Sequence, residues 1–232
     1  MKRFYKTVTT GPQGTCWQVL LDGRGVKSQG GRQQSVPSRA LADAMAAEWA
    51  GQGEQIDPKS FLLRDMADYA IDVVAADRDA AIAGLMPFAE TDTLCYRAEP
   101  GHALLARQEA AWEPLLAAAE KRWGVKFERI AGVMHRRQPA ATLERMRALL
   151  AEQDDFTLAA LRSLAGLAAS LVIALTALDD DALAEDLWAL ANLEEDFQAE
   201  LWGQDAEAMD LRARRFRDFA AAQRFAALVR AG

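Results

Sequence analysis

The sequence predicts an α+β protein, with a small N-terminal mixed α/β domain that contains a β-hairpin and a mainly helical C-terminal domain. Runs with strand character are confined to the first third of the 232 residues, whereas helical periodicity dominates the rest. Hydrophobic residues make up 51% of the chain, and much of that share is alanine, which favours helix over sheet. We expect residues 1–97 to form the first domain and residues 98–232 the second.

The predicted strands are short. In "CWQVLLDGRGVKS", residues 16–28, two extended runs flank Asp22-Gly23. Glycine accepts the positive φ that a tight hairpin turn requires, so this pattern predicts a β-hairpin. "RFYKTV", residues 3–8, is a second run of this kind, and "DTLCYRAEPG", residues 92–101, predicts a short strand or an extended link between the domains.

The predicted helices are longer and follow the 3.6-residue period. Their expected caps are Ser38 for the first, Asp155 for one that runs to residue 178, and Asp180 or Asp181 for one that runs to residue 202. Gly124 is expected to end a helix and Pro139 to open one, with residues 125–133 extended between them. The helical ranges are 38–50, 57–77, 102–123, 140–153, 156–178 and 183–202, with an arginine-rich helix after them.

The composition excludes several classes of function. A net charge of −7 makes nucleic acid and anionic membranes poor partners. The longest apolar run, residues 164–178, is too short to span a bilayer, and residues 1–10 resemble neither a signal peptide nor a presequence. We therefore expect a protein without stable membrane insertion, in the cytoplasm of a bacterium or, if a presequence has been removed, in the mitochondrial matrix.

Metal and cofactor sites are not predicted. The two cysteines, Cys16 and Cys95, and the two histidines lack the spacing of metal ligands. We expect both cysteines to be reduced core residues and the protein to need no cofactor. No serine lies in a G-x-S-x-G elbow. Asp92, close to Tyr96 and Arg97, forms a polar cluster at the domain junction that is typical of a structural role rather than a catalytic one.

Charge is segregated along the chain. Residues 163–211 contain twelve acids and no Lys, Arg or His, so the remaining residues carry a net charge of +5, the difference between −7 and −12. Four arginines follow at once, at positions 212, 214, 215 and 217. Such an acidic face beside a basic one can orient a partner. Two solvated helix faces that neutralise each other would give the same pattern, and the sequence leaves both interpretations open.

One carboxylate in "LEEDFQAELWGQDAEA", residues 193–208, lies out of pattern. Leu183, Leu187, Leu190, Phe197 and Leu201 follow one apolar stripe at about 100° per residue, and Glu194 falls in the middle of it. A carboxylate there loses hydration unless it is paired. Three roles remain open: an ion pair with Arg162 or Arg212, binding of a partner, or catalysis and metal binding together with Glu200 or Asp205.

The other acids of this motif, such as Glu195 and Asp196, are expected to be solvated. Trp202, like Trp49 and Trp112, fits a core position better than a ligand-binding one, and Gly203 is expected to close the helix after Trp202.

Several motifs together resemble one protein family, the assembly chaperones of the F-type ATP synthase that bind the α subunit of the catalytic head. The resemblance covers nearly the whole chain, in the order "RFYKTV", "VLLDGRGVKS", "LADAMAAEWAGQGEQIDP", "TDTLCYRA", "RQEAAWEPLL" and "LEEDFQAELWGQDAEA". One segment departs from it, because "SFLLRDMA", residues 60–67, stands where the family usually has a Met-Pro-Leu-Thr-like run.

The resemblance implies a chaperone without catalytic activity that holds unassembled α subunit and shields the surface that pairs with β. It also implies a transient complex, and we expect the protein to be a monomer. A carboxylate-based hydrolase or metal enzyme is the alternative. The partner-binding residues that we expect are Glu194, Gln198, Trp202 and Glu207. The other family motif positions are Trp49, Asp92, Tyr96, Arg97 and Gly203.

Overall fold

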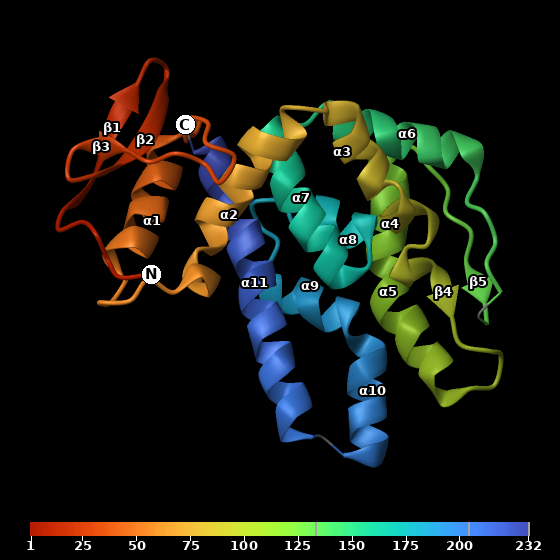
Figure 1. The fold of residues 1–232 in the computed structure, drawn as a ribbon. Helices are drawn as coiled ribbons and strands as arrows, with labels where there is room; N and C mark the ends of the chain where they lie inside the picture. Colours follow the sequence, from red (N-terminus) through yellow and green to blue (C-terminus); the bar gives the residue numbers. More distant parts are fainter. Residues whose placement is uncertain (133, 204, 232) are drawn as a thin grey trace. The chain divides into compact units, whose positions relative to one another are not determined.

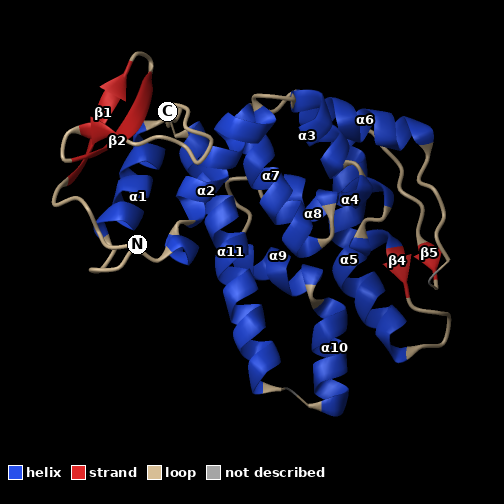
Figure 2. Ribbon diagram, in the orientation of Figure 1, coloured by secondary structure: helices blue, strands red, loops and turns tan. Residues whose placement is uncertain are grey.

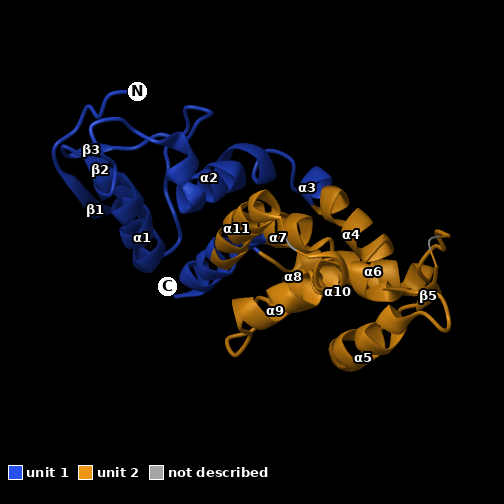
Figure 3. Ribbon diagram, turned by 90° about the horizontal axis from the view of Figure 1, so that it is seen from below, with its two compact units in different colours: residues 1–81, 154–160, 221–232 blue, residues 82–153, 161–220 orange. Residues whose placement is uncertain are grey.

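The computed structural model describes residues 1–132, 134–203 and 205–231, which form two compact units (Figure 1). Unit 1 contains residues 1–81, 154–160 and 221–232, and unit 2 contains residues 82–153 and 161–220 (Figure 3). Helices and strands are distributed as an α+β fold requires, so the predicted fold class is confirmed (Figure 2). The expected boundary at residue 97/98 concerns separate folding domains and stays a prediction.

Unit 1 contains a three-stranded antiparallel sheet in the order β1-β2-β3. The strands are β1 (Val8–Gln13), β2 (Cys16–Leu21) and β3 (Arg24–Gly25). Asp22 and Gly23 both have positive φ, 48° and 79°, and join β2 to β3 as the predicted hairpin. β1 begins only where the predicted run "RFYKTV" ends. Its Pro12 is tolerated because an edge strand has one side without ladder hydrogen bonds.

In unit 1 the first predicted helix is continuous, whereas the second is broken into shorter pieces. In α1 (Arg39–Ala50), the Ser38 hydroxyl oxygen accepts from the Leu41 N–H at 3.0 Å, so the predicted cap is confirmed. The predicted helix over residues 57–77 is instead three pieces: the 3₁₀ turn η1 (Pro58–Ser60), α2 (Leu62–Tyr69) and the π-helical turn η2 (Ala70–Val74). The short α3 (Arg78–Leu85) follows and contributes residues to both units.

Unit 2 is mainly helical. Its elements are α4 (Pro87–Glu90), the 3₁₀ turn η3 (Thr93–Cys95), β4 (Tyr96–Arg97), α5 (Ala103–Trp123), β5 (Ile130–Ala131), α6 (Ala140–Ala151), α8 (Leu171–Thr176), α9 (Ala184–Ala191) and α10 (Leu193–Trp202). Two further helices, α7 (Asp155–Ala168) and α11 (Ala206–Arg230), contribute residues to both units.

The long helix α5 connects a parallel pair of strands in unit 2. It ends at Gly124, whose φ of 67° is left-handed, as its sequence predicts. β4 then pairs in parallel with β5, with Tyr96 opposite Ile130, so both extended segments expected here exist. Val133, the last residue of the second segment, lies outside the described residues.

Two helices that the sequence predicts as continuous are broken. α7 and α8 are separated at Ala169, which has a φ of 49°, and Ser170 caps α8 by accepting from the Ile173 N–H at 3.0 Å. α9 and α10 are separated at Asn192. The caps predicted for these two helical segments are also wrong. The Asp154 carboxylate, not Asp155, accepts from the first N–H groups of α7. No side chain forms a capping hydrogen bond at the start of α9, where Asp180 or Asp181 was expected.

The described part of the chain contains no helix with the length and apolar character needed to cross a bilayer. Both cysteines are free; Cys95 is buried, whereas Cys16 on β2 is half-buried. Burial raises the pKa of the Cys95 thiol, which keeps it protonated and unreactive.

Ala169 gives a test of the break between α7 and α8. Its side chain is exposed and its φ is positive, a conformation that costs an L-residue about 1–2 kcal/mol. We expect Ala169→Gly to raise the free energy of unfolding by about 0.5–1 kcal/mol, because the strain outweighs the added freedom of the unfolded chain. Urea unfolding followed by circular dichroism measures the change.

The matched control is Ala165→Gly, inside α7 and fully buried. There the same substitution should lower the free energy of unfolding by about 1 kcal/mol. If Ala169→Gly destabilises the protein as much as Ala165→Gly does, residue 169 is not left-handed.

Candidate functional site

Glu194 on α10 is bound by an amide and not by an arginine. Its Oε1 accepts from the Gln108 Nε2 at 2.6 Å, and its side chain is half-buried. The ion pair with Arg162 or Arg212, one of the three roles left open by the sequence, is not formed. Arg212 binds Asp196, and the Arg162 guanidinium lies 5.5 Å above the Phe88 ring.

Gln108 uses both ends of its side chain. It lies on α5, is fully buried, and its Oε1 accepts from the Ala98 backbone N–H at 2.7 Å, directly after β4. Because the backbone N–H fixes which end of the amide is the acceptor, the Nε2 must point to Glu194. The side chain therefore connects the end of β4, α5 and the first turn of α10.

The other acids of α10 are each paired with an arginine, and Glu195 and Glu200 are exposed to solvent, as expected. Glu200 lies 2.7 Å from Arg107 on α5, and this hydrogen bond lowers the pKa of the Glu200 carboxyl. Asp196 binds Arg212 of α11 at 2.9 Å, and Glu195 lies 4.0 Å from Arg215. The Glu200–Arg107 pair is exposed and the other two are partly exposed, so salt screens them and each contributes little to stability.

A groove of about 800 Å³ lies between α10 and the first half of α11, which are neighbours in unit 2 (Figure 1). Trp202 is 79% exposed, so the expectation that it is a core residue is wrong. Helix α10 ends at this residue, and Gly203 leaves it with a φ of 88°. The lining of the groove includes Trp188, Gln198, Trp202, Met209, Leu211 and Phe216.

The predicted partner-binding residues do not all meet in this groove. Gln198 and Trp202 line it, together with Gly203. Glu194 is one turn earlier on α10 and faces Gln108 instead. Glu207 is exposed on α11 but does not line the groove, and its N–H donates to the Asp205 carboxylate at 3.3 Å. The rim is of mixed charge because Glu195, Asp196, Asp205, Arg212 and Arg215 all line it.

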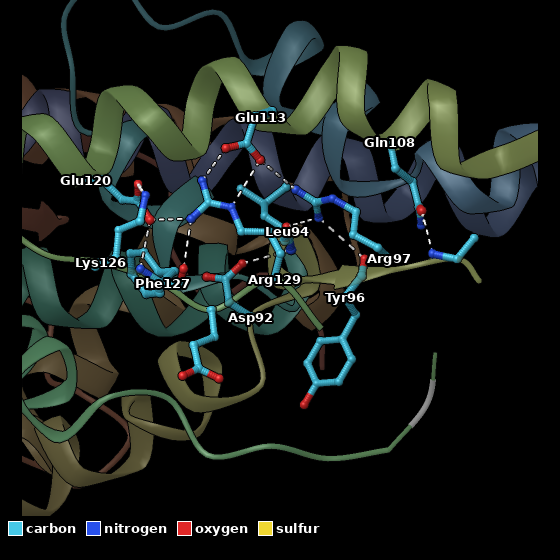
Figure 4. Close-up of polar contacts among 12 residues, drawn as sticks. Asp92, Leu94, Tyr96, Arg97, Gln108, Glu113, Glu120, Lys126, Phe127 and Arg129 are labelled. Carbon is cyan, nitrogen blue, oxygen red and sulfur yellow. Dashed lines mark hydrogen bonds and ion pairs between the residues drawn. The ribbon is translucent and has the colours of Figure 1, made fainter. Parts of the chain in front are cut away.

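Asp92 joins two segments of unit 2 through backbone hydrogen bonds. It is fully buried, and its two oxygens accept from the N–H groups of Leu94 at 3.0 Å (Figure 4) and of Val172 at 2.9 Å. Burial raises the pKa of Asp92 to about 6, although the hydrogen bonds from Val172 and its neighbours oppose that shift. The side chain thus ties η3 to the N-terminus of α8.

Arg97 belongs to a chain of alternating charges on α5 and the strands beside it (Figure 4). It is buried, donates to the Leu94 carbonyl, and lies 3.4 Å from the Glu113 carboxylate. Glu113 also accepts from the Arg129 Nε at 3.1 Å. Arg129 lowers the pKa of Glu113. At the other end, Arg129 binds Glu120, which is 2.7 Å from the Lys126 ammonium.

The remaining motif residues have simpler surroundings. The Tyr96 hydroxyl is 3.2 Å from the His135 Nδ1 at the surface of unit 2. Trp49 is 6% exposed in unit 1, and its ring lies 4.5 Å from that of Phe61. Among the described residues, no three His, Cys, Asp or Glu side chains are placed to hold a metal ion.

Gln108 and the α5 charges were not predicted from the sequence, although a signal exists for them. Gln108 and Glu120 are spaced with Trp112, Leu116 and Trp123 on one buried face of α5. They are polar residues on an apolar stripe, the same anomaly that identified Glu194.

Comparisons with known proteins give one consistent result. The family model described as "ATP12 chaperone protein" matches residues 2–120. The mitochondrial protein atp12 of Schizosaccharomyces pombe is 29% identical over 223 residues, which cover 90% of this chain and 77% of the relative.

Solved structures match over nearly the full length. The crystal structure of Atp12 from Paracoccus denitrificans is 35% identical, with a TM-score of 0.92 over 99% of this chain and 98% of the other. A point mutant of that protein gives 0.91 at the same identity and coverage. A structure from Agrobacterium tumefaciens is 36% identical, with a TM-score of 0.94 over 99% of this chain and 86% of the other.

Asp92 gives a pH-dependent test of unit 2. Because its folded-state pKa, about 6, lies above the ordinary 3.8, the folded protein binds this proton more tightly than the unfolded one. The free energy of unfolding should therefore fall as the pH rises from about 4 to 6, with a slope of at most about 1.4 kcal/mol per pH unit from this group. Asp92→Asn should flatten that slope. It should also destabilise the protein by about 1–3 kcal/mol at neutral pH, because an amide nitrogen cannot accept from a backbone N–H.

Urea unfolding at a series of pH values measures the slope, with the exposed acid variant Asp186→Asn as control. The control should keep the wild-type slope. If Asp92→Asn keeps it too, burial does not perturb Asp92.

Gln108→Leu tests the bridge from β4 to α10. It should lower the free energy of unfolding by about 1–3 kcal/mol, because the Ala98 N–H and the half-buried Glu194 both lose a partner. The neighbouring Glu109 is exposed, so Glu109→Leu should change the free energy of unfolding by no more than about 0.5 kcal/mol. Equal effects of the two variants in thermal unfolding would contradict the bridge.

Proposed function

We propose a client-holding role for this chain, which belongs to the ATP12 chaperone family. The resemblance drawn from the sequence motifs is thereby confirmed. The family and its relatives are named as chaperones or as Atp12 and not as enzymes, so the chain is a chaperone and the hydrolase alternative built on Glu194 is set aside. The proposed client is the α subunit of the F-type ATP synthase catalytic head. The chaperone holds it and shields the surface that pairs with β until the head assembles.

The groove between α10 and α11 is the observation that carries this proposal. A soluble protein rarely leaves a tryptophan mostly exposed, yet Trp202 lines this groove with Met209 and Leu211, which are each half-exposed or more. Tryptophan and methionine are enriched at the centres of protein interfaces. Methionine also adapts its shape to different apolar surfaces. These properties suit a client surface that is apolar because it will later be buried against β.

The acids beside the groove supply orientation in this proposal. Among the described residues Glu194 forms no ion pair, since its hydrogen bond comes from a neutral amide. No internal cation therefore neutralises this carboxylate, which lies one turn before Gln198. A basic residue of the client can pair with Glu194 while an apolar one enters the groove. Such pairs mainly set the orientation and rate of association.

The proposed setting follows from the same features. We infer a monomeric chaperone that binds its client transiently and binds no nucleic acid. It works in the bacterial cytoplasm or the mitochondrial matrix; the S. pombe relative is named mitochondrial, and the structural relatives are bacterial.

Capture from the native source tests the client. The tagged chain should retain α subunit that is free of β, and it should be absent from the finished synthase. Co-purification with the complete synthase would instead indicate a permanent subunit. Retention of neither would contradict the proposed client.

Substitutions test the groove. Trp202→Ser should weaken binding of isolated α subunit by about 30-fold or more, because truncation of a central interface aromatic has that cost. The measurements are fluorescence anisotropy of labelled α subunit and light scattering of its aggregation. The control is Leu201→Ser, since Leu201 is 59% exposed but does not line the groove. It should change affinity by less than about threefold.

Both side chains are exposed, so both variants should fold as the wild type does. If Trp202→Ser protects the α subunit as well as Leu201→Ser does, the client binds elsewhere on the chaperone.

A further inference from the structure

The groove between α10 and α11 is walled by a helix face on each side. Four residues of α10 line it at the i, i+3, i+4, i+7 spacing of one face: Glu195, Gln198, Ala199 and Trp202. At 1.5 Å per residue this face is about 10 Å long, or two helical turns. The lining of α11 extends over residues 208–216. The groove therefore has room for an elongated segment.

The lining offers few partners for the backbone of such a segment. Away from their ends, α10 and α11 pair their own backbone groups internally, so side chains alone face the groove. Arg212 is held by Asp196, and Arg215 donates to the Leu167 carbonyl. Of the side chains that the structure places in the groove, Gln198 is the only amide. A segment that enters the apolar part must satisfy its own backbone hydrogen bonds, and an α-helix does so.

Small side chains on both walls make room for a third helix. Ala199 on α10, and Ala208 and Ala213 on α11, line the groove together with larger apolar residues such as Trp202 and Met209. The distance between two packed helices depends on the side chains at their contact. The alanines allow the backbone of a bound helix to come close, while the larger residues pack against its apolar side chains.

The charge on these two helices favours a basic partner. Residues 193–211 contain seven acids and no Lys, Arg or His. Three of the seven, Glu195, Asp196 and Glu200, pair with arginines. The others form no ion pair with any residue that the structure describes: Glu194, Asp205, Glu207 and Asp210. A helix with lysine or arginine beside its apolar face complements this charge.

We propose that the groove holds one amphipathic helix of the client, about two to three turns long. Its apolar side chains pack on Trp202, Met209 and Leu211, and a lysine or arginine at the edge of its apolar face pairs with Glu194. This proposal rests on the proposed client role of the groove, and it specifies the conformation and the charge of the segment that binds there.

Photocrosslinking measures the conformation of the bound segment. Benzoylphenylalanine replaces Ala208 or Ala213 in the full chain, since both residues are exposed and line the groove. Each labelled chain is mixed with α subunit and irradiated, and mass spectrometry locates the crosslinked residues of the α subunit. The two positions are about 7.5 Å apart along α11. A bound helix should be crosslinked at residues about five apart in one segment, whereas an extended chain should give residues about two apart.

The matched control for the crosslinks is the same label at Ala206. This alanine is also exposed and lies on α11, but it does not line the groove. It should give no crosslink to the segment that positions 208 and 213 identify.

Glu194→Gln tests the charge. The new side chain can still accept from Gln108, so α10 should keep its place. The affinity for α subunit should fall about threefold or more and should depend less on salt, because one attractive charge is lost. The control, Asp186→Asn, makes the same charge change on α9 outside the lining of the groove, and it should bind as the wild type does.

The outcomes distinguish this proposal from the client role. Crosslinks about two residues apart, or scattered over several segments, overturn the helix although α subunit is the client. Retained α subunit without crosslinks from position 208 or 213 overturns the groove as its site. Wild-type affinity of Glu194→Gln overturns the basic residue. If α subunit is not retained at all, the client role itself is contradicted, and the helix with it.

Discussion

The Gln108 side chain is the interaction on which the helical unit depends. It lies on the buried face of α5, where an apolar residue would be the simpler choice, and it receives a hydrogen bond from the end of β4 while it donates one to α10. A buried amide is stable only when both ends are satisfied. The positions of β4, α5 and α10 are therefore coupled, since a shift of any one of them leaves a buried group unpaired.

The same helix carries a second set of polar groups, some of them buried and some half-buried. Glu113 and Glu120 hold Arg129 near β5, and Arg97 closes the set next to β4 (Figure 4). A parallel pair of two-residue strands has too few backbone hydrogen bonds to fix its own position. The charged side chains supply the missing contacts. Asp92 adds the connection to α8 through the Val172 N–H.

How much the sequence predicts depends on whether the signal is local. The hairpin at Asp22-Gly23, the Ser38 cap and the end of α5 at Gly124 are set by a residue's own conformational preference, and these predictions are correct. The breaks at Ala169 and Asn192 are harder to predict, because neither residue is a glycine or a proline and the cap at Ser170 lies inside a long apolar run. They are imposed by packing and by the Ser170 cap. Once α9 and α10 are separate helices, one continuous stripe from Leu183 to Leu201 cannot stay buried, and both of its end residues are exposed.

For the candidate site, periodicity identified the residue but not its partner. Glu194 is a carboxylate on an apolar stripe, and it does have a partner. The sequence cannot tell whether that partner is an amide or a guanidinium, because either group can donate a hydrogen bond to a carboxylate. The two partners differ in their effect on the charge of the carboxylate. An arginine would cancel the charge, as Arg212 does for Asp196. Gln108 fixes the Glu194 carboxylate and leaves its charge intact. A carboxylate that is held in place but not neutralised can pair with a cation from outside without first breaking an internal ion pair. Its position one turn from the groove is what makes this difference relevant to the proposed client.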